Sequence, residues 1–267
     1  MAIIWYFILA LIQAATEFLP VSSSGHLLFM KGILGGEQIP VIFDIVVHTG
    51  SLLAILIFYR DKLVNTFKGA REENQQKLLS GPNCRFIGYI AISTLITFGI
   101  YLIFKDPIER LYQSPAILWT TYIVTTLLLF STGLLKKNKT VPIAQKGVLL
   151  PIIAGFFQGV AIFPGVSRSG ATISSLLWFR VKREEAAYYS FFLAIPAILG
   201  ALIFKLADLE NLAFLVENSW VILSSFFVST LFSYLFLKLL VFVIRRGHLW
   251  YFGIYTMMLA VVSFILF

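Results

Sequence analysis

Long apolar stretches constrain this chain more than any other feature of its sequence. Six of them are long enough to cross a bilayer, for which about 20 predominantly apolar residues are needed. With 59% hydrophobic and only 13% charged residues, the chain is far more apolar than a soluble domain. We therefore expect an all-α, multi-pass integral membrane protein. The six predicted spans cover residues 40–58, 86–104, 114–135, 186–204, 219–244 and 249–267.

Two further apolar segments, residues 2–34 and 147–179, are interrupted in the middle by clusters of Pro, Gly and Ser. Neither can form one straight helix, because Pro removes a helical hydrogen bond and Gly and Ser favour turns. Each therefore predicts a helix, a loop and a second helix. No basic residue precedes Lys31, so the first segment lacks the positive region of a cleavable signal peptide and is expected in the folded protein. Residues 60–85 are mostly polar and predict a solvated or interfacial loop with some helix.

The two broken segments repeat one another. Shifted by 145 residues, QAATEFLPVSSSG from Gln13 aligns with QGVAIFPGVSRSG from Gln158, with six identities in thirteen positions. Each copy is followed by three of the predicted spans. We therefore expect a single membrane domain, residues 1–267, built from two similar halves, 1–135 and 146–267.

Basic residues predict how the chain is oriented in the membrane. If each span crosses once, fifteen Lys and Arg residues fall on one face and four on the other, and the positive-inside rule places the fifteen in the cytoplasm. This count requires both broken segments to enter and leave by the same face, so we expect two re-entrant hairpins. Because each half crosses the membrane three times, an odd number, the second half must run in the opposite sense to the first. The result is an inverted-topology repeat whose hairpin tips meet near the midplane. The fifteen lie in residues 59–85, 136–146, 180–183 and 245–246, and the four are Lys31, Lys105, Arg110 and Lys205.

Chemically active side chains gather at the two predicted tips. Irregular backbone at that depth is tolerated only where it is buried in protein or lines a polar cavity, so the tips predict a site. The first tip carries Glu17, Ser23 and His26, and the second carries Arg168. A charge at the bilayer centre is costly, so Glu17 and Arg168 are expected to be compensated by each other or by a charged ligand. Serines and glycines at the start of each returning helix, together with the planar fork of Arg168, are typical of a phosphate site.

Other charged groups have simpler explanations. The formal charge of +8 reflects basic loops beside apolar spans, so nucleic acid is not an expected partner. Asp44 and Lys238 lie near the ends of spans, where interfacial placement or snorkelling explains both. Asp44 and His48 are nevertheless four residues apart on one helix face and are candidates for groups that support the site. The single cysteine, Cys84, excludes an internal disulfide.

The motifs resemble those of a known family, the bacitracin-resistance type undecaprenyl-diphosphatases. QAATE fits their (E/Q)xxxE motif, PGVSRSGAT at residues 164–172 fits PGxSRSxxT, and FLPVSSSGH resembles their first active-site loop. The resemblance extends along nearly the whole chain, including FDIVVHTGSLLA and SFFLAIPAILGA. It implies a multi-pass enzyme of the bacterial plasma membrane that removes the terminal phosphate of a long-chain prenyl diphosphate lipid, undecaprenyl diphosphate, on the outer face. It also implies a divalent cation, Mg²⁺ or Ca²⁺, as cofactor.

The resemblance implies roles for individual residues. Glu17 would bind the metal or act as base, and Ser23 and His26 would be nucleophile and general acid or base. Because Ser23 and His26 are three residues apart across Gly25, we expect the imidazole to reach the hydroxyl. Arg168 would clamp the diphosphate, which completes a candidate catalytic set of four. Gln13 stands where many members have Glu, and a neutral ligand binds Mg²⁺ more weakly than a carboxylate does. The candidate substrate-binding residues are Gln13, Ser22, Ser24, Gly25, Ser167, Ser169, Gly170 and Thr172.

Two classes of function stay open from the residues alone. A hydrolase would let a Ser hydroxyl or water attack the terminal phosphorus while Arg168 and a metal neutralise the phosphoryl oxygens. A lipid-phosphate transporter or flippase would use the same inverted-repeat scaffold and Arg168 without needing Ser23 or His26 for chemistry. The sequence identifies neither the nucleophile, nor the prenyl chain length, nor the oligomeric state.

Overall fold

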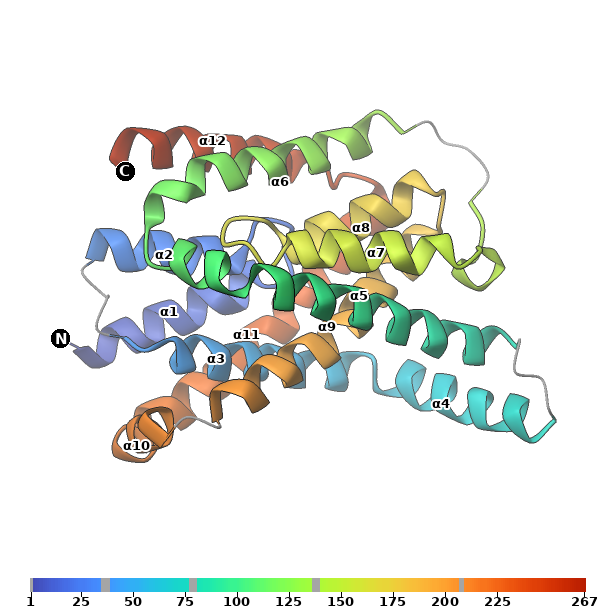
Figure 1. Cartoon of the computed structure of the whole chain (residues 1–267), viewed down its shortest axis with the longest axis horizontal. Coiled ribbons are helices and arrows are strands. Elements are labelled where there is room, and N and C mark those ends of the chain that lie inside the picture. The colour runs from blue at the N-terminus through green and yellow to red at the C-terminus, as the bar shows by residue number, and fades with distance from the viewer. Residues whose placement is uncertain (1, 35–38, 77–80, 136–139, 207–208) are drawn as a thin grey trace.

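Helices dominate the part of the chain that the computed structural model describes, residues 2–34, 39–76, 81–135, 140–206 and 209–267. Apart from an isolated bridge between Val141 and Val181, the described ranges contain no strand pairing, and most helices run along the long axis of the molecule (Figure 1). The first half contains α1 (Ala2–Thr16), α2 (Ser23–Leu34), α3 (Val41–Phe58), α4 (Arg60–Gln75), α5 (Pro82–Leu111), η2 (Pro115–Ile117) and α6 (Leu118–Gly133). The second half contains η3 (Ile143–Gln145), α7 (Leu149–Val160), α8 (Arg168–Trp178), α9 (Arg183–Leu206), α10 (Leu209–Glu217), α11 (Ser219–Arg246) and α12 (Tyr251–Leu266).

Four helices are long and apolar enough to cross a bilayer, namely α5, α6 with its preceding turn, α9 and α11. A fifth span results if α3 and α4, which meet at a bend of 70°, are counted together. The prediction of a multi-pass, all-α membrane protein is therefore confirmed. The predicted span at 249–267 contains α12, whose 16 residues fall short of the about 20 that a straight crossing requires. By length alone, the described helices support four or five spans.

The helices differ from the predicted segments at several places. α5 extends well beyond residues 86–104 at both ends, and the helix changes course at Phe104 (φ −109°, ψ 15°), shortly before Pro107, which cannot donate a helical hydrogen bond. The polar segment 60–85 begins with a full 16-residue helix, α4. The sequence also gave no indication of α10. Among the basic residues used for the orientation, Lys77, Lys136, Lys137 and Lys139 lie outside the described residues, as does the side chain of Lys205.

The two broken segments form pairs of short helices. α1 leads through a turn at residues 17–22 into α2, and α7 leads through a turn at residues 161–167 into α8. Figure 1 shows the α1–α2 pair in one half of the molecule and the α7–α8 pair in the other, with the two turns facing each other in the middle. α1 packs mainly against α11, and α7 packs mainly against α5.

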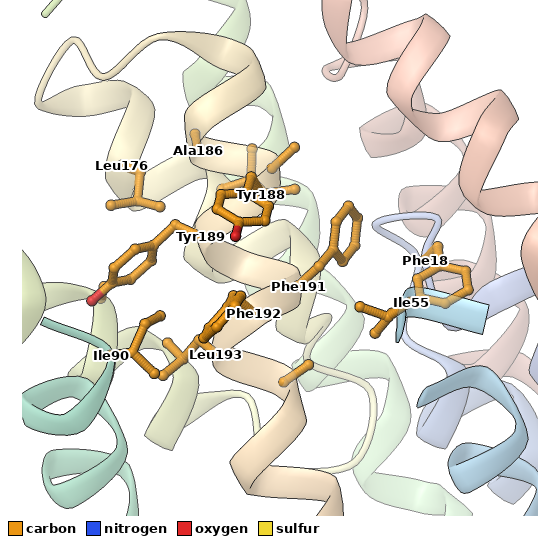
Figure 2. Close-up of a cluster of buried hydrophobic side chains, with 14 of the residues drawn as sticks. Phe18, Ile55, Ile90, Leu176, Ala186, Tyr188, Tyr189, Phe191, Phe192 and Leu193 are labelled. Carbon is orange, nitrogen blue, oxygen red and sulfur yellow. The ribbon is translucent and has the colours of Figure 1, made fainter. Parts of the chain in front are cut away.

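Helix α9 supplies more residues to the large hydrophobic core than any other helix. Its buried positions surround the helix rather than forming one stripe, which is typical of a helix enclosed by protein. The ring of Phe191 meets that of Phe18 edge to face at 5.5 Å, so α9 directly supports the turn that contains Glu17. Figure 2 shows Tyr188, Tyr189, Phe191, Phe192 and Leu193 of α9 with Phe18, Ile55, Ile90 and Leu176 from neighbouring segments.

The outward faces of the long helices are apolar. Leu95 and Ile103 on α5, Phe227 on α11 and Met258 on α12 are all more than half exposed. An exposed apolar surface that extends over several helices marks contact with a membrane. The same helices turn hydroxyls inward, such as the bonded pair Thr126 and Thr256 between α6 and α12 (2.7 Å), as expected for packing between helices in lipid.

Candidate active site

The turn between α1 and α2 contacts the turn between α7 and α8 directly. The Ser169 hydroxyl lies 3.4 Å from the carbonyl oxygen of Leu19. A Cβ atom added to Gly25 would lie 2.8 Å from the Cα atom of Gly165, so the two backbones touch at a point where only glycine fits. Gly165 also has a φ of +92°, which L side chains rarely adopt. The predicted meeting of the two tips is therefore present in the structure.

Serine hydroxyls cap the two returning helices in the same way. The Ser167 side chain accepts a hydrogen bond from the backbone N–H of Gly170 at the start of α8 (3.0 Å). At the start of α2, the Ser22 side chain accepts one from the N–H of Gly25 (3.2 Å). Ser22 has a positive φ of 68°, which is uncommon for a residue other than glycine. The structure thus gives these two candidate binding residues a capping role.

Glu17 lies at the end of α1 and is almost completely buried, at 6% exposure. Its Oε1 atom pairs with a terminal nitrogen of Arg168 from the opposite hairpin. Its Oε2 atom accepts hydrogen bonds from the Ser23 hydroxyl (2.6 Å) and from the Gln13 amide (2.8 Å), and His48 Nε2 lies 3.3 Å away. A buried carboxylate is tolerated when donors surround it in this way. Three of the four residues predicted to catalyse are thus brought together, because Ser23 and Arg168 each contact Glu17.

Two buried polar atoms beside Glu17 have no hydrogen-bond partner among the described residues. They are the second terminal nitrogen of Arg168 and the side-chain oxygen of Gln13. A buried unpaired polar group costs free energy, and in native proteins such groups call for an explanation such as catalysis or a bound ion. The Arg168 nitrogen could donate to a phosphate oxygen, and the Gln13 oxygen could bind a cation.

His26 lies on α2 but does not contact Ser23. Its Nδ1 atom is 2.7 Å from the carbonyl oxygen of Ser22, and because a carbonyl only accepts, Nδ1 carries a proton. In the neutral imidazole, Nε2 then accepts from the Tyr255 hydroxyl of α12, at 2.8 Å. The two rings stack, with centroids 5.7 Å apart. The predicted approach of the His26 imidazole to the Ser23 hydroxyl was wrong, since Ser23 bonds to Glu17 and both ring nitrogens are occupied elsewhere.

His48 and Asp44, predicted as possible supporting groups, have different roles. His48 contacts Glu17 through Nε2 and lies 2.6 Å from the Asp44 carbonyl oxygen through Nδ1, so Nδ1 carries a proton. The Asp44 carboxylate instead pairs with Lys31 at 2.7 Å, one turn of α3 away from His48. His48 therefore belongs to the shell around Glu17, while Asp44 ties α2 to α3.

The remaining candidate residues of the second hairpin build the start of α8. Thr172 donates to the backbone oxygen of Arg168 (2.8 Å) and is bonded to Ser190 of α9. Ser169 is 3.4 Å from the Ser167 hydroxyl, and both are buried. Ser24 of the first hairpin is half-buried and bonds to Ser22 at 3.3 Å. These residues fix the position of Arg168 and of the first turns of α2 and α8.

Sequence reasoning missed two residues that hold the site. Tyr255 comes from α12, far away in sequence, and no local pattern marks it. Thr125 of α6 donates to the Gly165 carbonyl oxygen (2.8 Å) and accepts from the Ser167 N–H (3.0 Å), so it fixes the second turn from the side. Thr125 is one of several threonines in its apolar span, and in sequence it is indistinguishable from an ordinary helix-packing residue.

Comparisons with known proteins cover nearly the whole chain. Residues 6–262 match the family profile described as bacitracin resistance protein BacA. An undecaprenyl-diphosphatase from Methanosphaera stadtmanae is 34% identical, over 97% of this chain and 96% of its own length. Another from Carboxydothermus hydrogenoformans is 36% identical, over 97% of this chain and 95% of its own length.

Proposed function

The chain belongs to the bacitracin resistance protein BacA family, and from this we infer that it is an undecaprenyl-diphosphatase. It hydrolyses undecaprenyl diphosphate to undecaprenyl phosphate and inorganic phosphate, which returns the lipid carrier to cell-wall synthesis. The observation that carries the site assignment is the buried Glu17 carboxylate, which contacts Ser23 from its own hairpin and Arg168 from the other. The same arrangement brings a hydroxyl, a base and a cation together at one point.

In the proposed reaction, the Ser23 hydroxyl oxygen attacks the terminal phosphorus and its proton passes to Glu17 Oε2. The 2.6 Å contact between these two atoms supports this pairing, since a positioned base must lie within hydrogen-bond reach of the proton it takes. The bond from phosphorus to the bridging oxygen breaks, and the prenyl phosphate leaves. Water then hydrolyses the phosphoserine and releases inorganic phosphate.

Arg168 stabilises the charge on the phosphoryl oxygens during attack. One terminal nitrogen stays on Glu17, and the other, which has no partner among the described residues, donates to the substrate. This division needs no movement of the side chain, so the group is preorganised for the developing charge. His26, held by Ser22 and Tyr255, is the candidate acid or base for the second step.

A divalent cation fits this set of side chains when the substrate supplies further oxygens. The described residues contain no group of three or more His, Cys, Asp or Glu that could hold an ion by themselves. Glu17 and the unpaired oxygen of Gln13 are the residues that would hold it. Mg²⁺ commonly binds through one or two protein oxygens and substrate phosphates, and it would neutralise phosphoryl charge.

The proposed architecture has six spans and two re-entrant hairpins in an inverted-topology repeat. Contacts between helices support it, because α1 packs on α11 as α7 packs on α5, while α3 packs on α9 and α6 on α12. A two-fold relation that maps α1 onto α7 and α5 onto α11 also maps the contact between α1 and α11 onto the contact between α7 and α5. With the basic loops in the cytoplasm, the first hairpin, and with it the site, opens to the outer face of the bacterial plasma membrane.

Phosphate release from purified protein tests the proposal. The protein in detergent should release inorganic phosphate from undecaprenyl diphosphate, and a chelator should stop the release. A transporter on the same scaffold would bind the lipid without releasing phosphate. Full activity after exhaustive chelation would remove the cation from the proposal but leave the hydrolase intact.

A further inference from the structure

A cavity of about 990 Å³ lies away from Glu17. It is formed where the C-terminal ends of α6, α8 and α11 meet the N-terminal end of α9. Arg168 begins α8 and Trp178, which ends it, lines the cavity. At 1.5 Å per residue, about 15 Å of helix separates the two places, so the cavity is not part of the candidate active site.

Five basic and two acidic side chains line this cavity. Both carboxylates are engaged, since Glu184 lies 3.1 Å from Arg245 Nε and Glu185 lies 3.8 Å from Lys182 Nζ. Two of the arginines have no carboxylate partner within the described ranges. The cavity therefore has an excess of positive charge and guanidinium groups free to bind an anion. The basic residues are Lys62, Arg180, Lys182, Arg183 and Arg245, and the arginines without a carboxylate partner are Arg180 and Arg183.

Arg180 holds its place in the cavity at a conformational cost. It follows the end of α8 with a positive φ of 59°. Its N–H bonds to the Leu177 oxygen (2.8 Å) and the N–H of Val181 bonds to the Leu176 oxygen (3.2 Å), the Schellman arrangement in which this position is normally glycine. The left-handed conformation is unfavourable for a residue with a Cβ. Among the described residues, the only other non-glycine with positive φ is Ser22, in the candidate active site.

A smaller, more apolar cavity of about 260 Å³ adjoins the basic one. The two share four lining residues, and the smaller one is otherwise lined mainly by carbon-rich side chains. A molecule that filled both would need a charged head and an apolar tail. The shared residues are Lys62, Glu184, Ile244 and Arg245, and the others are Phe58, Tyr59, Ala187 and Val241.

We propose that the basic cavity binds a phosphomonoester head group and that the adjoining cavity receives the start of an attached apolar chain. Arg180 and Arg183 supply planar guanidinium groups, which match phosphate oxygens in pairs. In the orientation proposed above, this site faces the cytoplasm, on the side opposite to the phosphatase site. The competing explanation is that these cations only orient the protein and complement helix C-termini, which requires neither a cavity nor a strained Arg180.

A fluorescent reporter beside the cavity tests the proposal independently of the phosphatase site. Leu134 lines the cavity and its side chain is 84% exposed, so Leu134→Cys in a Cys84→Ser background accepts a bimane label. Farnesyl phosphate contains no anhydride to hydrolyse and is the main probe, with farnesol and inorganic phosphate in separate titrations. Farnesyl phosphate should shift the emission saturably, and farnesol should not. A shift by inorganic phosphate with equal affinity would support the head-group site and rule out the chain-binding part.

The decisive variant is Arg180→Gly. Glycine relieves the positive φ, so the variant should be at least as heat-stable as the parent, while farnesyl phosphate binding should weaken about ten-fold through loss of a charge-assisted hydrogen bond. The matched control is Arg246→Ala, which removes an equal charge from the C-terminal end of α11, at a residue that packs on Phe242 and does not line the cavity. An emission shift that farnesol reproduces would overturn the proposal. Equal weakening by the two variants would also overturn it.

Discussion

Replacing Arg168 by lysine tests separately the two contacts assigned to its guanidinium group. One terminal nitrogen pairs with Glu17, and the other is buried without a partner among the described residues. Lysine preserves a cation beside Glu17 but offers a point charge instead of a planar fork. The fold should therefore survive Arg168→Lys, and only the bond assigned to the substrate should be lost.

The size of the loss follows from that one bond. A hydrogen bond to a charged group contributes about 1.5–3 kcal/mol, and a barrier change of about 1.4 kcal/mol is a factor of ten in rate. Arg168→Lys should therefore lower kcat/KM by about 10- to 150-fold. Arg168→Ala should behave differently, because an unpaired buried Glu17 costs about 3–5 kcal/mol in stability.

The assay is phosphate release by each purified variant over a range of prenyl diphosphate concentrations, together with its thermal unfolding in the same detergent. The expected pattern is a near-wild-type Tm with low kcat/KM for Arg168→Lys, and a lowered Tm for Arg168→Ala. Near-wild-type kcat/KM in Arg168→Lys would refute the reasoning, because the unpaired nitrogen would then have no role in the reaction. If the Tm of Arg168→Lys were as low as that of Arg168→Ala, the claim that lysine maintains the ion pair with Glu17 would be refuted.

Three further predictions address the nucleophile, the cation and the orientation. Ser23→Ala should abolish phosphate release at saturating substrate, whereas Ser24→Ala, which removes the neighbouring hydroxyl, should retain most of it; substantial activity in Ser23→Ala would make water the nucleophile. Glu17→Gln should lower activity through loss of the base, and its residual activity should need a higher Mg²⁺ concentration for half-maximal rate; an unchanged Mg²⁺ requirement would remove Glu17 from the metal site. In intact cells without the native cysteine, an impermeant thiol reagent should label Glu109→Cys but not Arg246→Cys, and the reverse pattern would invert the proposed topology.

Much of the site was predictable because the repeat and the charges constrain the same residues. Glu17 and Arg168 are charged groups at two related breaks in apolar segments, so each needed a partner, and the structure pairs them. The serine-capped starts of α2 and α8 were predictable for the same reason. Side chains that depend on the packing of distant helices were not predictable, and Tyr255 is the clearest example.

The errors have local physical causes. Ser23 and His26 are three residues apart, which suggested contact, but the first turn of α2 directs the Ser23 hydroxyl back to Glu17 and the His26 ring towards α12. The segment 60–85 was expected to contain some helix, and because its first part is rich in residues that favour helices, that helix, α4, extends over 16 residues. Periodicity and polarity define which face is buried, but they do not define where a helix begins or ends.

The repeat also explains why neither half contains a complete site. With the shift of 145 residues, Ser23 corresponds to Arg168, and these are the first residues of α2 and α8. Both side chains reach the same carboxylate, one at each oxygen of Glu17, as expected if Glu17 lies close to the axis that relates the halves. The position equivalent to Glu17 is Ile162, so only the first hairpin carries the proposed base. The serine caps that the two halves share fix the geometry in both, and the differences at these few positions divide the proposed chemistry, with the proposed nucleophile and base in one hairpin and the proposed phosphate clamp in the other.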